Sequence, residues 1–161
     1  MIVLNEGECR VAKGLAKLRY EANRNGGVYN QKIGAQSDEF TDLEGIAGEL
    51  AFCKMLNIFP DMSIEPRAGS VDCILPSGVT IDVKTTKYPS GKLTATMKKK
   101  VGDVDIYALM VGEFPSYRYA GYARASDLIN ESCVGTLGHG PTYILGQGKL
   151  IPAYPKDKET K

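Results

Sequence analysis

The fold is decided by residues 71–84, which read VDCILPSGVTIDVK. Apolar and polar residues alternate on both sides of the Pro-Ser-Gly segment, and this period of two is typical of β-strands. We therefore expect a β-hairpin whose loop consists of Pro76, Ser77 and Gly78, with Gly78 at positive φ. In that register Leu75 pairs with Val79.

The same register brings two carboxylates and one ammonium group to one face. Counting back from the loop, Asp72 faces Asp82, and Lys84 lies on the same face two residues further on. Like charges directly opposite each other destabilise a sheet, so a compensating cation is needed. Mg²⁺ and Mn²⁺ prefer carboxylate oxygens. The hairpin therefore predicts a divalent-metal site, and the alternative is an ordinary solvated hairpin face.

A third acid comes from a helix expected to start at Thr41 and to run to about Leu56. Thr41 and Glu44 form an S/T-x-x-E capping box, which gives Glu44 a structural role. Glu49 lies beside the apolar stripe of this helix and has no basic residue four positions on. We expect Glu49 to complete the metal site; the alternative is that it lies on an exposed edge of the helix.

The remaining pattern indicates an α/β (α+β) fold with a central mixed β-sheet flanked by helices. A first helix is expected over about 6–24, with an apolar stripe of Val11, Leu15, Leu18 and Ala22. Further strands are expected over 92–97, 104–112 and 117–124, and the continuously apolar 104–112 segment should lie mid-sheet. One last strand is expected in the loop-rich, glycine-rich tail around 139–145. A short helix is expected over about 126–132.

The chain length favours one domain. With 161 residues, of which 43% are hydrophobic, the chain can bury a proper core. We divide it into an N-terminal helix and loop (1–37), a core (38–155) and a frayed tail (156–161). Tyr29 and Ile33 are possible anchors of the loop.

Positive charge is clustered near the proposed centre although the net charge is only +1. Such clusters can bind the phosphates of DNA, although solvated loops are also often lysine-rich. The candidate DNA-binding residues are Lys87, Lys92, Lys98, Lys99 and Lys100.

Other classes of site and location are disfavoured. The four cysteines show no CxxC spacing and there is a single histidine, His139, so a structural zinc site is not expected. No segment resembles a signal peptide or a membrane span, so we expect a cytoplasmic protein without a membrane partner.

Glu49, Asp72 and the triplet Asp82-Val83-Lys84 resemble, in order and spacing, the PD-(D/E)xK superfamily of restriction-endonuclease-like nucleases. One position departs from the motif, since Val71 stands where the motif has proline. The resemblance implies a restriction-endonuclease-like core and catalytic roles for Asp72, Asp82, Lys84 and Glu49. The same three acids and the Val83 carbonyl would bind Mg²⁺ or Mn²⁺, and Lys84 would contact the attacking water and the phosphate.

Most of the chain also resembles small uncharacterised bacteriophage proteins, in segments such as 19–34, 45–52 and 137–141. The predicted function is therefore metal-dependent hydrolysis of DNA phosphodiester bonds in phage or bacterial DNA processing, in the host cytoplasm if the protein is phage-encoded. A homodimer is possible because nucleases that cut both strands often use two centres. The alternative is an inactive nucleic-acid- or protein-binding module on a nuclease scaffold.

Overall fold

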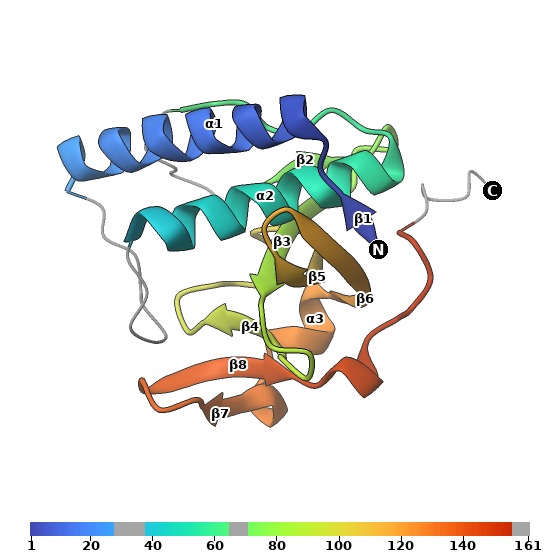
Figure 1. Cartoon of the computed structure of the whole chain (residues 1–161). Helices are drawn as coiled ribbons and strands as arrows, with labels where there is room; N and C mark the ends of the chain where they lie inside the picture. Colours follow the sequence, from blue (N-terminus) through green and yellow to red (C-terminus); the bar gives the residue numbers. More distant parts are fainter. Residues whose placement is uncertain (28–37, 65–70, 156–161) are drawn as a thin grey trace.

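The computed structural model describes residues 1–27, 38–64 and 71–155, in which three α-helices, a five-stranded sheet and a three-stranded sheet form an α+β fold (Figure 1). The helices are α1 (Glu6–Asn25), α2 (Asp38–Leu56) and the short α3 (Ala125–Leu128). The larger sheet has the order β1 (Ile2–Val3), β6 (Ser116–Arg124), β5 (Ile106–Glu113), β3 (Thr80–Thr86) and β2 (Cys73–Ile74). The smaller sheet has the order β4 (Leu93–Thr96), β8 (Pro141–Leu145) and β7 (Val134–Thr136). The predicted loop anchors Tyr29 and Ile33 and the predicted tail 156–161 lie outside the described residues.

Strand β5 lies in the middle of the larger sheet, as its apolar sequence predicted. It runs parallel to β3 and antiparallel to β6, so the sheet is mixed. Its side chains alternate between two clusters of buried residues: Ile106, Ala108 and Met110 pack with the helices, whereas Tyr107, Leu109 and Val111 pack on the other face. Burial on both faces explains why this strand lacks a polar alternation.

The hairpin of β2 and β3 has the predicted register. The amide of Leu75 donates to the carbonyl of Val79 at 2.9 Å, and Cys73 pairs with Ile81. Gly78 takes a φ of +86°, which the turn requires and which glycine adopts without a steric penalty. Local alternation and turn chemistry were therefore sufficient to set this register.

Helix α2 begins three residues before the predicted N-cap, so the assignment of Thr41 as the cap is wrong. Glu44 does not serve as a capping partner. Its carboxylate instead accepts hydrogen bonds from the Phe114 amide at 3.0 Å and the Tyr117 hydroxyl at 2.8 Å. Glu44 does not cap the helix because its carboxylate is hydrogen-bonded to the turn between β5 and β6 and to β6 itself.

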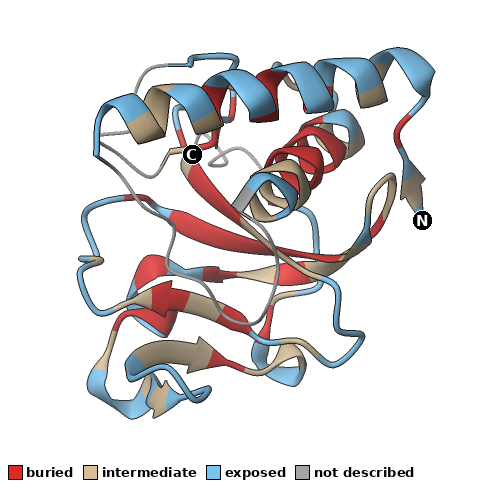
Figure 2. Ribbon diagram, turned by 60° about the vertical axis from the view of Figure 1, so that its left-hand side comes forward, coloured by how far each residue is buried: buried red, intermediate tan, exposed pale blue. Residues whose placement is uncertain are grey.

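Helix α1 packs on α2, which in turn packs on β3, β5 and β6 (Figure 1). The buried residues of α1 are Ala12, Leu15, Ala16 and Arg19, whereas Val11 and Leu18 are 43% and 47% exposed. The predicted apolar stripe was therefore rotated relative to the true inner face. Figure 2 shows that α1 forms the outer layer, with exposed residues along one side, and that the largely buried α2 lies beneath it.

The three-stranded sheet was not predicted as a separate layer. The expected strand 92–97 and the last strand expected in the tail are present as β4 and β8. They pair with each other, with Leu93 opposite Leu145, and β7 was missed. The short helix is also smaller than expected, with α3 followed by a 3₁₀ turn over Glu131–Cys133. Together with α3, this sheet covers the face of β5 opposite the long helices. Among the described residues, no helix has both the length and the apolar character needed to cross a membrane.

Candidate active site

Strand β3 carries the central carboxylate of the predicted site. Ile81 and Val83 belong to the core under the long helices. Because side chains alternate along a strand, Asp82 and Lys84 point to the opposite face, toward the second sheet. Asp82 is only 1% exposed and pairs with Tyr107 of β5 across the parallel ladder.

Two lysines neutralise Asp82. The Lys84 Nζ lies 2.5 Å from Oδ1 and the Lys99 Nζ lies 3.1 Å from Oδ2. Lys99 donates a hydrogen bond to Oδ2, and the ammonium group of Lys84 lies against Oδ1. A buried carboxylate with one cation against each of its oxygens is the central feature of the site.

The environment keeps Lys84 protonated. Burial lowers the pKa of this ammonium group, but attraction to Asp82, followed by smaller contributions from Asp72 and Glu49, outweighs burial and raises the pKa above its ordinary value of 10.5. Lys84 therefore provides a fixed positive charge at neutral pH.

Asp72 lies beside this centre and bonds to the backbone of β3. It is 3% exposed, and its Oδ2 accepts the amide proton of Val83 at 2.7 Å. Its own amide donates to the carbonyl of Ile81 at 2.8 Å, just beyond the last regular pair of β2. The structure thus links Asp72 to the amide of Val83, whose carbonyl was the predicted metal ligand.

Glu49 is buried in the helical layer, so the alternative of an exposed helix edge is wrong. It is 8% exposed and forms an ion pair of 3.0 Å with Arg19 of α1. Arg19 also donates to the carbonyls of Asp61 at 2.7 Å and Ser63 at 2.9 Å. The three predicted acids therefore have different principal partners: two lysines for Asp82, a backbone amide for Asp72 and an arginine for Glu49.

Arg19 was missed by the sequence analysis although a signal was present. It follows Leu15 by four residues and Ala12 by seven, which places it on the same face of α1. A basic residue on the buried face of one helix and an acidic residue beside the apolar stripe of the next indicate a buried pair.

The donor set suits a divalent cation, although the acids are not gathered into a compact cluster. Among the described residues, no group of three or more His, Cys, Asp or Glu side chains is placed to hold a metal ion. The carboxylates of Asp82 and Asp72 are nevertheless both buried, and Asp72 bonds to Val83, the residue next to Asp82. Oxygen donors of this kind match Mg²⁺ and Mn²⁺.

The predicted DNA-binding lysines divide into two groups. Lys99 is half-buried and directed at Asp82, with a side chain 20% exposed. The others are exposed, and Lys87 lies over the ring of Tyr88 with its Nζ 5.6 Å from the centroid. The exposed group comprises Lys87, Lys92, Lys98 and Lys100.

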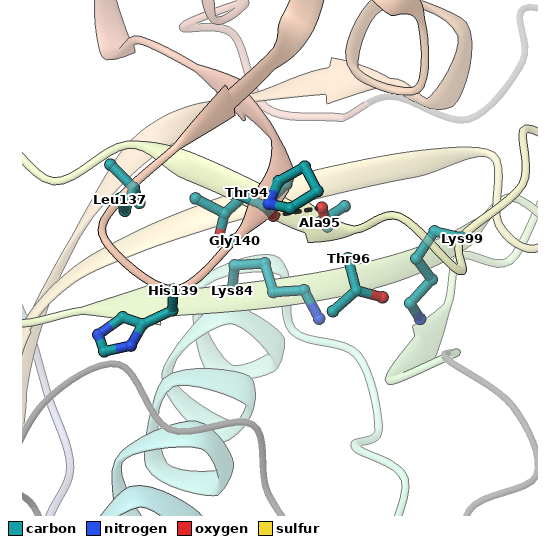
Figure 3. A pocket seen from close by; sticks show the side chains of 10 residues that line it. Lys84, Thr94, Ala95, Thr96, Lys99, Leu137, His139 and Gly140 are labelled. Atoms are coloured by element: carbon teal, nitrogen blue, oxygen red, sulfur yellow. Dashed lines mark hydrogen bonds between the residues drawn. The ribbon is translucent and has the colours of Figure 1, made fainter.

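A cavity of about 160 Å³ opens beside the two lysines (Figure 3). Its walls come from β3, β4, the loop after β4, the β7–β8 loop and β8. Lys84, Lys99 and the exposed His139 contribute to the lining. Figure 3 shows the ammonium groups of Lys84 and Lys99 on either side of Thr96, whereas the ring of His139 points away from them.

Comparison with known proteins finds one family. No curated protein and no solved structure matches the chain. A family model matches residues 1–127, a segment that contains Glu49, Asp72, Asp82, Lys84 and Lys99 and ends before β7 and β8. The chain therefore belongs to the Family of unknown function (DUF5843).

Proposed function

We propose that the protein is a divalent-metal-dependent nuclease that hydrolyses DNA phosphodiester bonds, with a restriction-endonuclease-like core and a role in phage or bacterial DNA processing. The observation that carries this proposal is the environment of Asp82. This carboxylate is 1% exposed and has two ammonium partners, Lys84 at 2.5 Å and Lys99 at 3.1 Å. Burying such a charged cluster is costly, and clusters of this kind are concentrated at functional sites.

Each residue of the cluster has a part in phosphodiester hydrolysis. A bound Mg²⁺ or Mn²⁺ would polarise the phosphate and activate water. Asp82 and Asp72 supply carboxylate oxygens for the ion, while Lys84 holds positive charge where the phosphate is attacked. Glu49, oriented by Arg19, is the third candidate acid.

The test is cleavage of supercoiled, linear, single-stranded and branched DNA with Mg²⁺ or Mn²⁺. We expect Asp82→Asn and Lys84→Met each to lower the cleavage rate by about 100-fold or more, because each removes a charge needed at the reacting phosphate. Glu131→Gln, an exposed carboxylate in the 3₁₀ turn after α3, is the matched control and should cleave at the wild-type rate. Wild-type cleavage by Asp82→Asn, with unchanged circular dichroism, would refute the proposal.

A DNA-binding module without catalysis is the second candidate. It is favoured by the two lysines that already balance Asp82 and by the lack of a three-acid group in the described part of the chain. Calorimetric titration with Mn²⁺ separates the two functions. A binding signal that disappears in Asp72→Ala supports the nuclease, whereas salt-sensitive DNA binding that ignores metal supports the module.

A further inference from the structure

The cavity beside Asp82 has the chemistry of an anion site. Among the described residues, its titratable lining residues are Lys84, Lys99 and His139, without any Asp or Glu. Asp82 lies behind the lysines and does not line the cavity, so the two ammonium groups are the charges at its wall. An anion that enters the cavity therefore meets cations before it meets the buried acid.

Hydrogen-bond donors remain available at the cavity wall. Each lysine ammonium has three N–H donors, and Asp82 occupies only part of this capacity. The hydroxyl of Thr142 donates to the Ala95 carbonyl at 2.7 Å. Those of Thr94 and Thr96 form no hydrogen bond with any other residue in the described ranges, so they can turn toward a ligand.

The cavity is small. Its volume of about 160 Å³ lies below the roughly 300–1,000 Å³ of pockets that enclose drug-sized ligands. A single tetrahedral anion is the matching occupant, since a base would need more space and an aromatic wall. Within the part of the chain that the structure describes, the one aromatic ring in the lining is that of His139, which points away from the ammonium groups (Figure 3).

We propose that this cavity binds one phosphate group of the nucleic-acid strand through Lys99, Lys84 and the hydroxyl of Thr96. The inference rests on the proposed function for the identity of the strand. The inference assigns Lys99 and Thr96 to substrate binding. The acids and Lys84 remain the candidate groups for hydrolysis of the phosphodiester. The bound phosphate sets the position of the neighbouring phosphodiester relative to Asp82.

Inorganic phosphate titrated into the untagged protein in EDTA tests the proposal. Because the chain has one histidine, the imidazole proton signals in a ¹H NMR spectrum belong to His139 at the rim of the cavity. We expect a saturable shift of these signals at constant ionic strength. Lys99→Met should raise the dissociation constant by about tenfold or more and Thr96→Val by about fivefold, because charge-assisted hydrogen bonds are lost.

Lys149→Met is the matched control. It removes the same charge from an exposed residue of the 3₁₀ turn Gln147–Lys149, which does not line the cavity. The dissociation constant of this variant should stay within about twofold of wild type. Equal weakening by Lys99→Met and Lys149→Met, or no saturable shift in the wild-type protein, would overturn the proposal.

Oligonucleotides identify the source of the phosphate. Fluorescence anisotropy in EDTA compares single strands with and without a 5′-phosphate. If the phosphorylated strand binds more tightly and Lys99→Met abolishes this preference, the cavity takes a terminal phosphate. If both strands bind equally and Lys99→Met weakens both, the cavity takes an internal phosphate. Binding of both strands that Lys99→Met leaves unchanged counts against the cavity.

These measurements separate this proposal from the proposed function because no metal or cleavage is involved. Phosphate binding that depends on Lys99, without cleavage under any metal condition, would retain the anion site and reject the nuclease. Metal-dependent cleavage without phosphate binding in the cavity would retain the nuclease and reject the anion site.

Discussion

Arg19 is a buried arginine on a helix whose other buried residues are apolar. It is 6% exposed, and its guanidinium group bonds Glu49 and two backbone carbonyls of the segment after α2. The fork of five N–H donors suits such a multiple contact better than a lysine would. At the scale of single residues, this contact joins α1 to the candidate acid of α2.

Loss of Arg19 should therefore destabilise the protein strongly. We expect Arg19→Met to lower the free energy of unfolding by about 3–5 kcal/mol, because it removes one partner of a buried ion pair. Urea denaturation followed by circular dichroism measures the change.

Arg10→Met on the same helix is the control for this prediction. Its ion pair with Glu6 has side chains 78% and 81% exposed, so we expect a change below about 0.5 kcal/mol. A loss in Arg19→Met no greater than that in Arg10→Met would show that the buried pair contributes little.

At the scale of elements, α2 and β3 approach closely at Gly48. A Cβ atom at Gly48 would lie 1.9 Å from Oγ1 and 3.0 Å from Cβ of Thr85. Thr85 immediately follows the Asp82-Val83-Lys84 triplet, so the close approach fixes the distance between the helix carrying Glu49 and the strand carrying Asp82. No side chain larger than hydrogen fits without moving one of the two elements.

The close approach predicts opposite effects for two glycines of one helix. Gly48→Ala should lower the free energy of unfolding by about 1–3 kcal/mol through overpacking. Gly45→Ala, whose Cβ would have no neighbour within 4 Å, should raise it by about 0.5–1 kcal/mol through helix propensity. Urea denaturation of both variants tests the pair.

A rescue experiment ties the effect of Gly48→Ala to its contact. Combining it with Thr85→Ala removes the overlapping hydroxyl and should recover part of the loss. Equal stability of Gly48→Ala and Gly45→Ala would contradict the packing explanation.

At the scale of the whole molecule, the larger sheet has a buried tyrosine on each face. Tyr107 packs with the second sheet and α3, Tyr117 packs under the long helices, and both are 0% exposed. Burial raises the pKa of both hydroxyls above the ordinary value of 10.0, assisted by Asp82 and Asp103 at Tyr107 and by the hydrogen bond to Glu44 at Tyr117. The folded protein therefore retains protons that the unfolded chain loses.

Stability should consequently fall as the pH rises above about 10. Burial also raises the pKa of Tyr119. In that range the folded state therefore binds up to three more protons than the unfolded chain, so these tyrosines lower the free energy of unfolding by up to about 4 kcal/mol per pH unit. Below the unfolded pKa both states are protonated and the contribution to the slope is absent. Urea denaturation between pH 9 and 11 measures it.

Two phenylalanine variants test the source of this slope. Tyr107→Phe should reduce the slope by about a third, since one of the three tyrosines with a raised pKa is removed. Tyr88→Phe, at an exposed position, should leave the slope unchanged. Parallel pH profiles for wild type and Tyr107→Phe would exclude Tyr107 as a cause.

Short-range patterns were sufficient for several parts of this fold. The alternation on both sides of Gly78 determined the hairpin register, the apolar run around Leu109 determined a central strand, and helical periodicity located α1. These features depend on turn chemistry, strand alternation and burial, which neighbouring residues specify on their own. The local order also placed Asp82 and Lys84 on one strand face.

The amino-acid sequence by itself determined the hairpin and the charged residues it presents, because these follow from interactions a few residues apart. Only the tertiary structure decided that Lys99 pairs with Asp82, that Arg19 pairs with Glu49, and that β4 and β8 form a second sheet bordering the phosphate-sized cavity. These partners are 17 residues apart for Lys99 and Asp82 and 30 for Arg19 and Glu49. A buried charge selects its partner only when packing has removed water and brought distant elements into contact, which no local pattern specifies.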